Sequence, residues 1–123
     1  MGLNRMVWYG LVLVLPLFLW PLLVGGQEYE KWDARIAEYK RWLDSVGSTG
    51  SRLWLRLNSK RRPHRLYVGK SFYNLDYKGK EEFIEIFSHY LAGHPEKFAL
   101  VDIFDARTEK RIGEFGWGGF KLY

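Results

Sequence analysis

The chain has 123 residues, a net charge of +5 and no cysteine, which excludes disulfide scaffolds, thiol nucleophiles and cysteine-ligated metal centres. Hydrophobic residues make up 47% of the chain and aromatic residues 18%, a composition that argues against a disordered protein. After an apolar N-terminal segment, residues 27–123 remain, which is enough for one small domain with one core.

The N-terminal segment is a charge-free apolar run of 19 residues, positions 6–24, preceded by Arg5 and followed by Glu28 and Glu30. A helix of that length is roughly 28 Å long, close to the ~30 Å hydrocarbon layer of a bilayer. The positive flank is expected to stay in the cytoplasm. The sequence therefore predicts a single-pass protein of the cytoplasmic membrane with its C-terminal domain outside.

A removed signal peptide is the alternative for the same segment. Gly25 and Gly26 before Gln27 resemble a cleavage site, with helix-breaking Pro21 just upstream. Against cleavage, the apolar run exceeds the usual length of a signal peptide's core. Under both interpretations the domain lies outside the cytoplasm. Without cleavage it stays anchored in the membrane, and after cleavage it is a free exported or periplasmic protein. We predict a signal-anchor segment over 1–26 and an extracytoplasmic domain over 27–123.

The domain is predicted to begin with an amphipathic helix over 27–47. Apolar residues recur there at intervals of three and four: Tyr29, Trp32, Ile36, Tyr39, Leu43 and Val46. We expect this stripe to pack on the domain's own sheet. A homodimer through a coiled coil over 29–46 stays open as an alternative, although the seam is shorter than the three or four heptads that would support one.

The predicted core over 52–123 has the order ββαββ. Strands are expected over 52–58, where Leu53, Leu55 and Leu57 alternate on one face, and then at 65–69, 98–104 and 111–117, with a helix over 80–92 between the second and third strands. The predicted fold is therefore α+β, of order α-β-β-α-β-β. Its sheet is four-stranded, mainly antiparallel and covered on one face by two helices.

The basic charge is concentrated on the first hairpin. Residues 52–70 contain seven of the 19 basic residues and no acidic residue, with Trp54 and Tyr67 expected on the outward face. We predict a partner-binding surface made of Arg52, Trp54, Arg56, Lys60, Arg61, Arg62 and Arg65, with secondary contacts from Trp117 and Phe120 near the C-terminus. The simpler alternative is a solvated hairpin tip whose charges prevent edge-to-edge aggregation.

A cationic surface of this kind attracts phosphate and carboxylate groups. Outside the cytoplasm, the expected partner is an envelope or membrane protein, with an anionic lipid or polymer as a further possibility. Basic residues with interleaved aromatic residues also suit nucleic acid, but the predicted compartment makes nucleic acid an unlikely partner.

The sequence leaves two other functions open. Glu85, His89 and His94 could hold a metal ion in a small metal-dependent or hydrolytic enzyme, because Glu85 and His89 share one helix face and His94 follows one turn later. The second alternative is a small-ligand-binding domain with a pocket between the first helix and the sheet. The side chains of Trp32, Trp42 and Phe87 would exclude this alternative if they filled that space. No catalytic set, cofactor motif or metal motif is evident, so the sequence favours a non-catalytic binding or accessory module.

Overall fold

The computed structural model describes residues 20–123, and for residues 20–30 it describes the backbone alone. Its contacts divide the chain into two units, 1–31 and 32–123. The predicted membrane segment over 6–24 lies almost wholly outside the described residues. Among those that are described, no helix is both long enough and apolar enough to cross a bilayer. The membrane span and its cleavage therefore stay predictions.

Helix α2 runs from Trp20 to Ser45 and ends just before Gly47. In the second unit its apolar stripe is half-buried or buried, as the spacing of three and four predicts: Trp32, Ile36, Tyr39, Leu43 and Val46. Leu43 is 1% exposed and belongs to the core of the domain. The amphipathic character of this part of the helix is thus confirmed.

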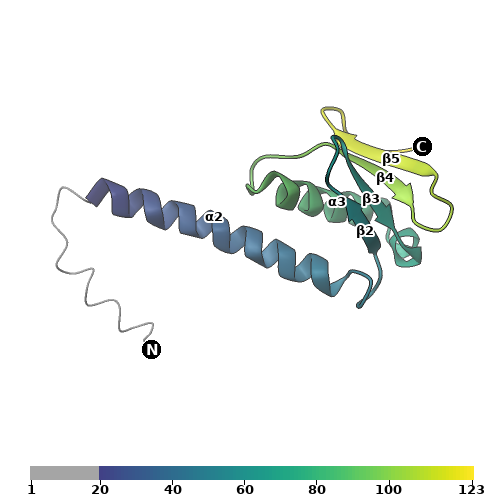
Figure 1. The fold of residues 1–123 in the computed structure, drawn as a ribbon, viewed down its shortest axis with the longest axis horizontal. Coiled ribbons are helices and arrows are strands. Elements are labelled where there is room, and N and C mark those ends of the chain that lie inside the picture. The colour runs from purple at the N-terminus through teal and green to yellow at the C-terminus, as the bar shows by residue number, and fades with distance from the viewer. Residues whose placement is uncertain (1–19) are drawn as a thin grey trace. The chain divides into compact units, whose positions relative to one another are not determined.

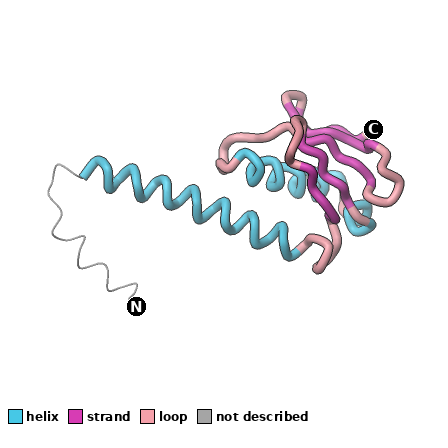
Figure 2. Tube along the Cα trace, in the orientation of Figure 1, coloured by secondary structure: helices cyan, strands magenta, loops and turns pink. Residues whose placement is uncertain are grey.

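The sheet has five strands in the order β2-β3-β4-β5-β6. Figure 2 shows the strands of the sheet in magenta, side by side. They are β2 (Trp54–Asn58), β3 (His64–Val68), β4 (Val101–Asp105), β5 (Arg111–Gly116) and β6 (Gly119–Leu122). The prediction of four strands is wrong, because Trp117 and Gly118 form a turn and the chain then returns beside β5 as a fifth strand. Gly119 takes a φ of 83°, which glycine adopts without strain, and Phe120 then pairs with Phe115.

The sheet is mixed, with β3 and β4 parallel and the other neighbouring pairs antiparallel. Helix α3 (Tyr77–Ala92) connects the two parallel strands, and a short 3₁₀ helix, η2 (Lys70–Asn74), precedes it. Helix α3 starts about one turn earlier than predicted because the Asp76 carboxylate accepts a hydrogen bond from the Gly79 N–H at 2.7 Å. It ends at Gly93, which has a left-handed φ of 71°.

A β-bulge changes which residues of β2 face the core. The register with β3 shifts between Trp54 and Arg56, so Leu55 is the extra residue. Trp54 and Leu57 consequently pack against the core, and Leu55 lines a cleft at the end of the sheet. The predicted alternation of three leucines on one face is therefore wrong at Leu55.

One face of the sheet is covered and the other is open. Helix α3 lies against the covered face (Figure 1), where its buried residues Phe83, Ile84 and Phe87 join the buried strand residues Leu66, Val68, Val101 and Ile103. The strand residues between them face away from the helix and are half-buried or exposed: Arg56, Arg65, Tyr67, Asp102, Phe104 and Glu114. The fold is α+β with two helices, and it leaves one sheet face for other contacts.

Candidate functional site

The cations of the basic hairpin lie in three separate places. Arg56 and Arg65 stand on the open face of the sheet, Arg52 precedes β2, and the turn between β2 and β3 contains Lys60, Arg61 and Arg62. Among the side chains of residues 31–123, Arg56 is the one cation of this set that forms an ion pair, with Glu109 at 3.4 Å between exposed side chains. The other positive charges are free to attract an anionic partner.

The turn between β2 and β3 projects its charges into solvent. Lys60, Arg61 and Arg62 are exposed. The turn is held by two local hydrogen bonds, from the Lys60 N–H to the Asn58 side chain at 3.1 Å and from the Arg62 guanidinium to the Ser59 carbonyl at 2.9 Å. A cis peptide bond precedes Pro63. Charges at such a position act over about one Debye length, ~8 Å in physiological salt.

The open face carries an arginine–aromatic platform formed by Arg56, Arg65, Tyr67 and Phe104. Tyr67 and Phe104 are register partners on β3 and β4, and their rings stack with centroids 5.2 Å apart. The Arg56 guanidinium lies 3.9 Å from the centre of the Tyr67 ring, and the Arg65 guanidinium lies 5.2 Å from that of Phe104. These contacts hold the cations in place on the sheet surface.

Phe104 belongs to this platform, although the sequence predicted it only as the last residue of a strand over 98–104. Val101 and Ile103 are buried, whereas Asp102 and Phe104 point to the open face. The signal was present in the sequence: a charged residue in the middle of an apolar strand indicates that its neighbours alternate between two different environments.

The other side of the open face is neutralised by its own ion pairs. Arg111 donates to Asp102 at 2.8 Å and to Glu114 at 2.9 Å, and the Tyr123 hydroxyl also donates to Glu114. The Arg111 guanidinium lies 5.2 Å from the Tyr123 ring centre. The net positive charge of the face is consequently concentrated on the β2–β3 side.

Three aromatic residues of the predicted binding surface have different environments. The indole N–H of Trp54 donates a hydrogen bond to the Leu43 carbonyl at 2.8 Å. The centroids of the Trp54 and Phe87 rings are 5.0 Å apart. Phe120 is 5% exposed and belongs to the core. The expected outward orientation of Trp54 is therefore wrong, and Trp54 and Phe120 are unsuited to direct binding. Trp117 is 87% exposed in the turn between β5 and β6, with its ring 5.0 Å from that of Phe98.

His89 and His94 engage in local structural contacts. The His89 Nδ1 atom is 2.5 Å from the Lys97 carbonyl oxygen, and the His94 Nδ1 atom accepts a hydrogen bond from the Glu96 N–H at 3.0 Å. The His94 ring also packs 4.4 Å from the Trp32 ring. In the described part of the chain, no three histidine, aspartate or glutamate side chains gather as metal ligands, Glu85, His89 and His94 included.

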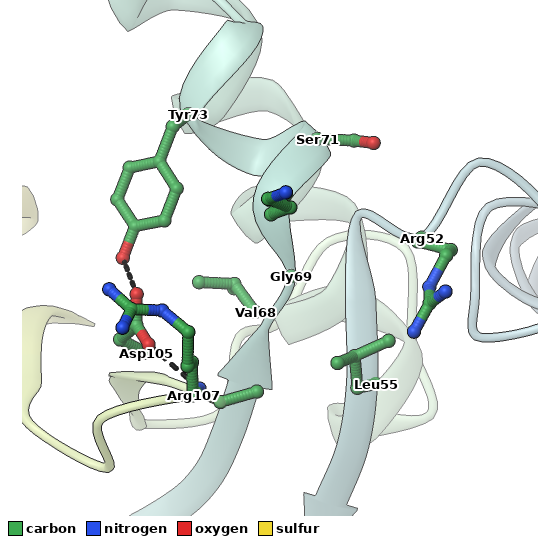
Figure 3. Close-up of a pocket in the computed structure, with 10 residues that line it drawn as sticks. Arg52, Leu55, Val68, Gly69, Ser71, Tyr73, Asp105 and Arg107 are labelled. Atoms are coloured by element: carbon green, nitrogen blue, oxygen red, sulfur yellow. Dashed lines mark hydrogen bonds between the residues drawn. The ribbon is translucent and has the colours of Figure 1, made fainter.

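The space between α2 and the sheet is occupied by Leu43, Trp54 and Phe87, where a ligand pocket was one of the expected alternatives. A cleft of about 480 Å³ lies elsewhere, at the carboxyl ends of β3 and β4 (Figure 3). Three separate segments line it, which is why no local motif in the sequence pointed to it: Arg52 with Leu55, residues 68–73 except Phe72, and Asp105 to Arg107.

The strongest polar contact in this cleft joins Tyr73 and Asp105. The Tyr73 hydroxyl donates to the Asp105 carboxylate at 2.5 Å, and the N–H groups of Arg107 and Thr108 donate to the other carboxylate oxygen at 2.7 and 2.8 Å. Burial of its hydroxyl, together with this hydrogen bond, raises the pKa of Tyr73 to about 12. The hydrogen bond from Tyr73, followed by that from Thr108, lowers the pKa of Asp105.

Comparison with known proteins gave no match to a family model, to a curated protein or to a solved structure.

Proposed function

We propose that the protein is a non-catalytic binding module that is held at the outer face of the cytoplasmic membrane by residues 6–24 and docks an acidic surface of another envelope protein. The observation that carries this proposal is the segregation of charge. Residues 52–70 contain seven cations and no acidic residue, and six of these cations have no ion-pair partner among the side chains described, residues 31–123. The docking surface is the arginine–aromatic platform together with the hairpin tip, Lys60, Arg61 and Arg62.

The composition of the platform favours a protein partner over a lipid surface. Protein interfaces are enriched in arginine and aromatic residues and depleted in lysine at their centres. Arg56 and Arg65 are already positioned on Tyr67 and Phe104, so less side-chain entropy is lost when they bind carboxylates. The hairpin tip adds charges at the rim, which speed association more than they strengthen the bound complex.

Site-specific photocrosslinking of the full chain in its native membranes tests this proposal. A photoreactive phenylalanine analogue replaces Tyr67 on the open face, and in a control chain it replaces Lys78, an exposed residue of α3. We expect a discrete protein adduct from position 67 and none from position 78. Raising the ionic strength should weaken the adduct, because both the platform and the tip act through charge.

Charge reversal separates the docking surface from the overall charge of the protein. Arg61→Glu with Arg62→Glu should reduce the adduct several-fold, whereas the matched pair Arg35→Glu with Arg41→Glu on α2 should leave it unchanged. Equal adducts from both pairs would overturn the proposal. Binding to phosphatidylglycerol vesicles that depends on Arg61 and Arg62, without any protein adduct, would assign the surface to lipid and also overturn it.

A further inference from the structure

The cleft at the end of the sheet is formed where two parallel strands finish. Val68 ends β3 and Asp105 ends β4, and these two residues are register partners. Because parallel strands place their carboxyl ends at the same edge, the loops that follow them meet there, as they do at ligand sites of α/β sheets. A volume of about 480 Å³ lies within the range of small-molecule pockets.

The lining combines an apolar floor with cations. Leu55, Val68 and Ala106 supply apolar surface, and the exposed cations are Arg52, Lys70 and Arg107. None of these cations forms an ion pair with a side chain of residues 31–123, the part whose side chains are described. In Figure 3, Arg52 and Leu55 lie on one side of the cleft, Tyr73, Asp105 and Arg107 lie on the other, and Val68 lies between them.

The single carboxylate of the lining is already engaged. Asp105 accepts hydrogen bonds from the Tyr73 hydroxyl and from two backbone N–H groups, as described above. These donors offset part of its negative charge, so the three cations are left to act on a ligand. The sum of the formal lining charges is positive, and an anion is the ligand class that it favours.

The backbone holds Arg52 at the edge of the cleft in an uncommon conformation. Arg52 has a φ of 63°, in the left-handed region that costs a non-glycine residue energy. Its N–H donates to the Gly47 carbonyl at 3.0 Å. A Cβ atom at Gly69 would lie 2.4 Å from the Arg52 carbonyl oxygen, so this close approach requires glycine. The structure thus maintains a strained backbone at a position where a cation lines the cleft.

We propose that this cleft binds a phosphate monoester, with the phosphate held among Arg52, Lys70 and Arg107 and the organic group on Leu55, Val68 and Ala106. A guanidinium can pair with two phosphate oxygens at once, and two guanidiniums and one ammonium from three different segments suit a dianion better than a single carboxylate. The site is separate from the proposed docking surface. The monoester could be a soluble metabolite or the headgroup of a phosphatidic acid.

Binding of phosphate monoesters is measured by NMR, from the chemical-shift changes of the backbone amides. The sample is the full-length, isotope-labelled protein in zwitterionic detergent. One arm titrates glycerol 3-phosphate and the other a short-chain phosphatidic acid. We expect saturable shifts at Lys70, Ser71, Ala106 and Arg107. Saturation by glycerol 3-phosphate identifies a soluble ester, and saturation by phosphatidic acid alone identifies the lipid headgroup. Absence of saturable shifts in both arms overturns the proposal.

Matched variants establish that the cleft, and not the total charge, is responsible. Arg52→Gln with Arg107→Gln removes two cations from the cleft, and Arg61→Gln with Arg62→Gln removes two from the hairpin tip. The first pair should raise the Kd for the phosphate ester at least about tenfold, since it removes charge-assisted hydrogen bonds from two guanidiniums to the phosphate oxygens. The second pair should leave the Kd within about twofold. If both pairs weaken ester binding equally, the proposal is overturned. The photocrosslinked adduct at position 67 reports on the docking surface alone, so the two proposals can fail independently.

Discussion

His64, at the start of β3, is a buried titratable residue. It is 4% exposed, and its Nδ1 atom has no hydrogen-bond partner in the described part of the chain. Burial, and then the charge of Arg62, lowers the pKa of His64 below its ordinary value of 6.5. The unfolded chain therefore binds a proton at a higher pH than the folded one. The stability contributed by neutral His64 is fully present above pH 6.5 and is lost as the pH falls below it.

This linkage predicts a pH-dependent thermal stability. The melting temperature should fall between pH 7.5 and pH 5.5, and His64→Leu, which has a similar volume and cannot titrate, should show a smaller fall. Thermal unfolding followed by circular dichroism at the two pH values measures the difference. Identical pH dependence in the two proteins would show that other groups are responsible.

Replacing either tryptophan of the predicted binding surface by phenylalanine should change the free energy of unfolding by different amounts. Trp54→Phe keeps the apolar ring but leaves the Leu43 carbonyl without its 2.8 Å donor, which should cost about 1–2 kcal/mol of unfolding free energy. Trp117→Phe, at a residue 87% exposed, should change it by no more than about 0.5 kcal/mol. Urea unfolding compares them. Equal losses would contradict the core position of Trp54.

At the scale of elements, a buried hydroxyl joins α3 to the segment before β4. Ser88 is fully buried, and its Oγ atom donates to the Ala99 carbonyl at 2.7 Å and accepts from the Ala99 N–H at 2.8 Å. The backbone of residue 99 therefore has both of its polar groups paired with one helix side chain. This contact sets where the chain enters β4, and thereby its register with β3.

Removing that hydroxyl should weaken the domain. Ser88→Ala leaves both groups of Ala99 without this partner and should lower the free energy of unfolding by about 1–3 kcal/mol. Glu85→Ala, one turn earlier on the exposed side of α3, is the matched control and should cost less than about 0.5 kcal/mol. Urea unfolding measures both, and a Ser88→Ala protein as stable as the control would exclude the proposed role.

At the scale of the whole molecule, the predicted membrane location rests on residues 6–24. The full chain should remain in the membrane pellet after alkaline carbonate extraction, and a chain beginning at residue 27 should be soluble. Leu13→Arg should reduce membrane integration, because a charge at the centre of a span costs about 2.5–3.5 kcal/mol, and Leu13→Ile should not. A full-length chain that is soluble before any processing would refute the predicted anchor.

Much of the fold could be predicted because its signals are local. Short residue patterns are enough to recognise three of its parts: the apolar stripe from Trp32 to Val46, the apolar face of α3 and the β2–β3 hairpin. Strand β6 escaped prediction because four glycines between 113 and 119 have low strand propensity. Pairing of Phe115 with Phe120 across a glycine turn overrides that propensity.

The sequence by itself determined the order of the helices and of the first four strands. It also determined the location of the basic hairpin and of the apolar N-terminal run, because hydrophobic periodicity and charge are local properties of the sequence. The tertiary structure alone decided the parallel pairing of β3 with β4, the bulge that turns Trp54 inward, the stacking of Tyr67 on Phe104 and the cleft between Arg52 and Arg107. Each of these depends on backbone pairing and packing between distant segments. Such contacts are fixed by the free energy of the whole core and leave no mark in any short stretch of residues.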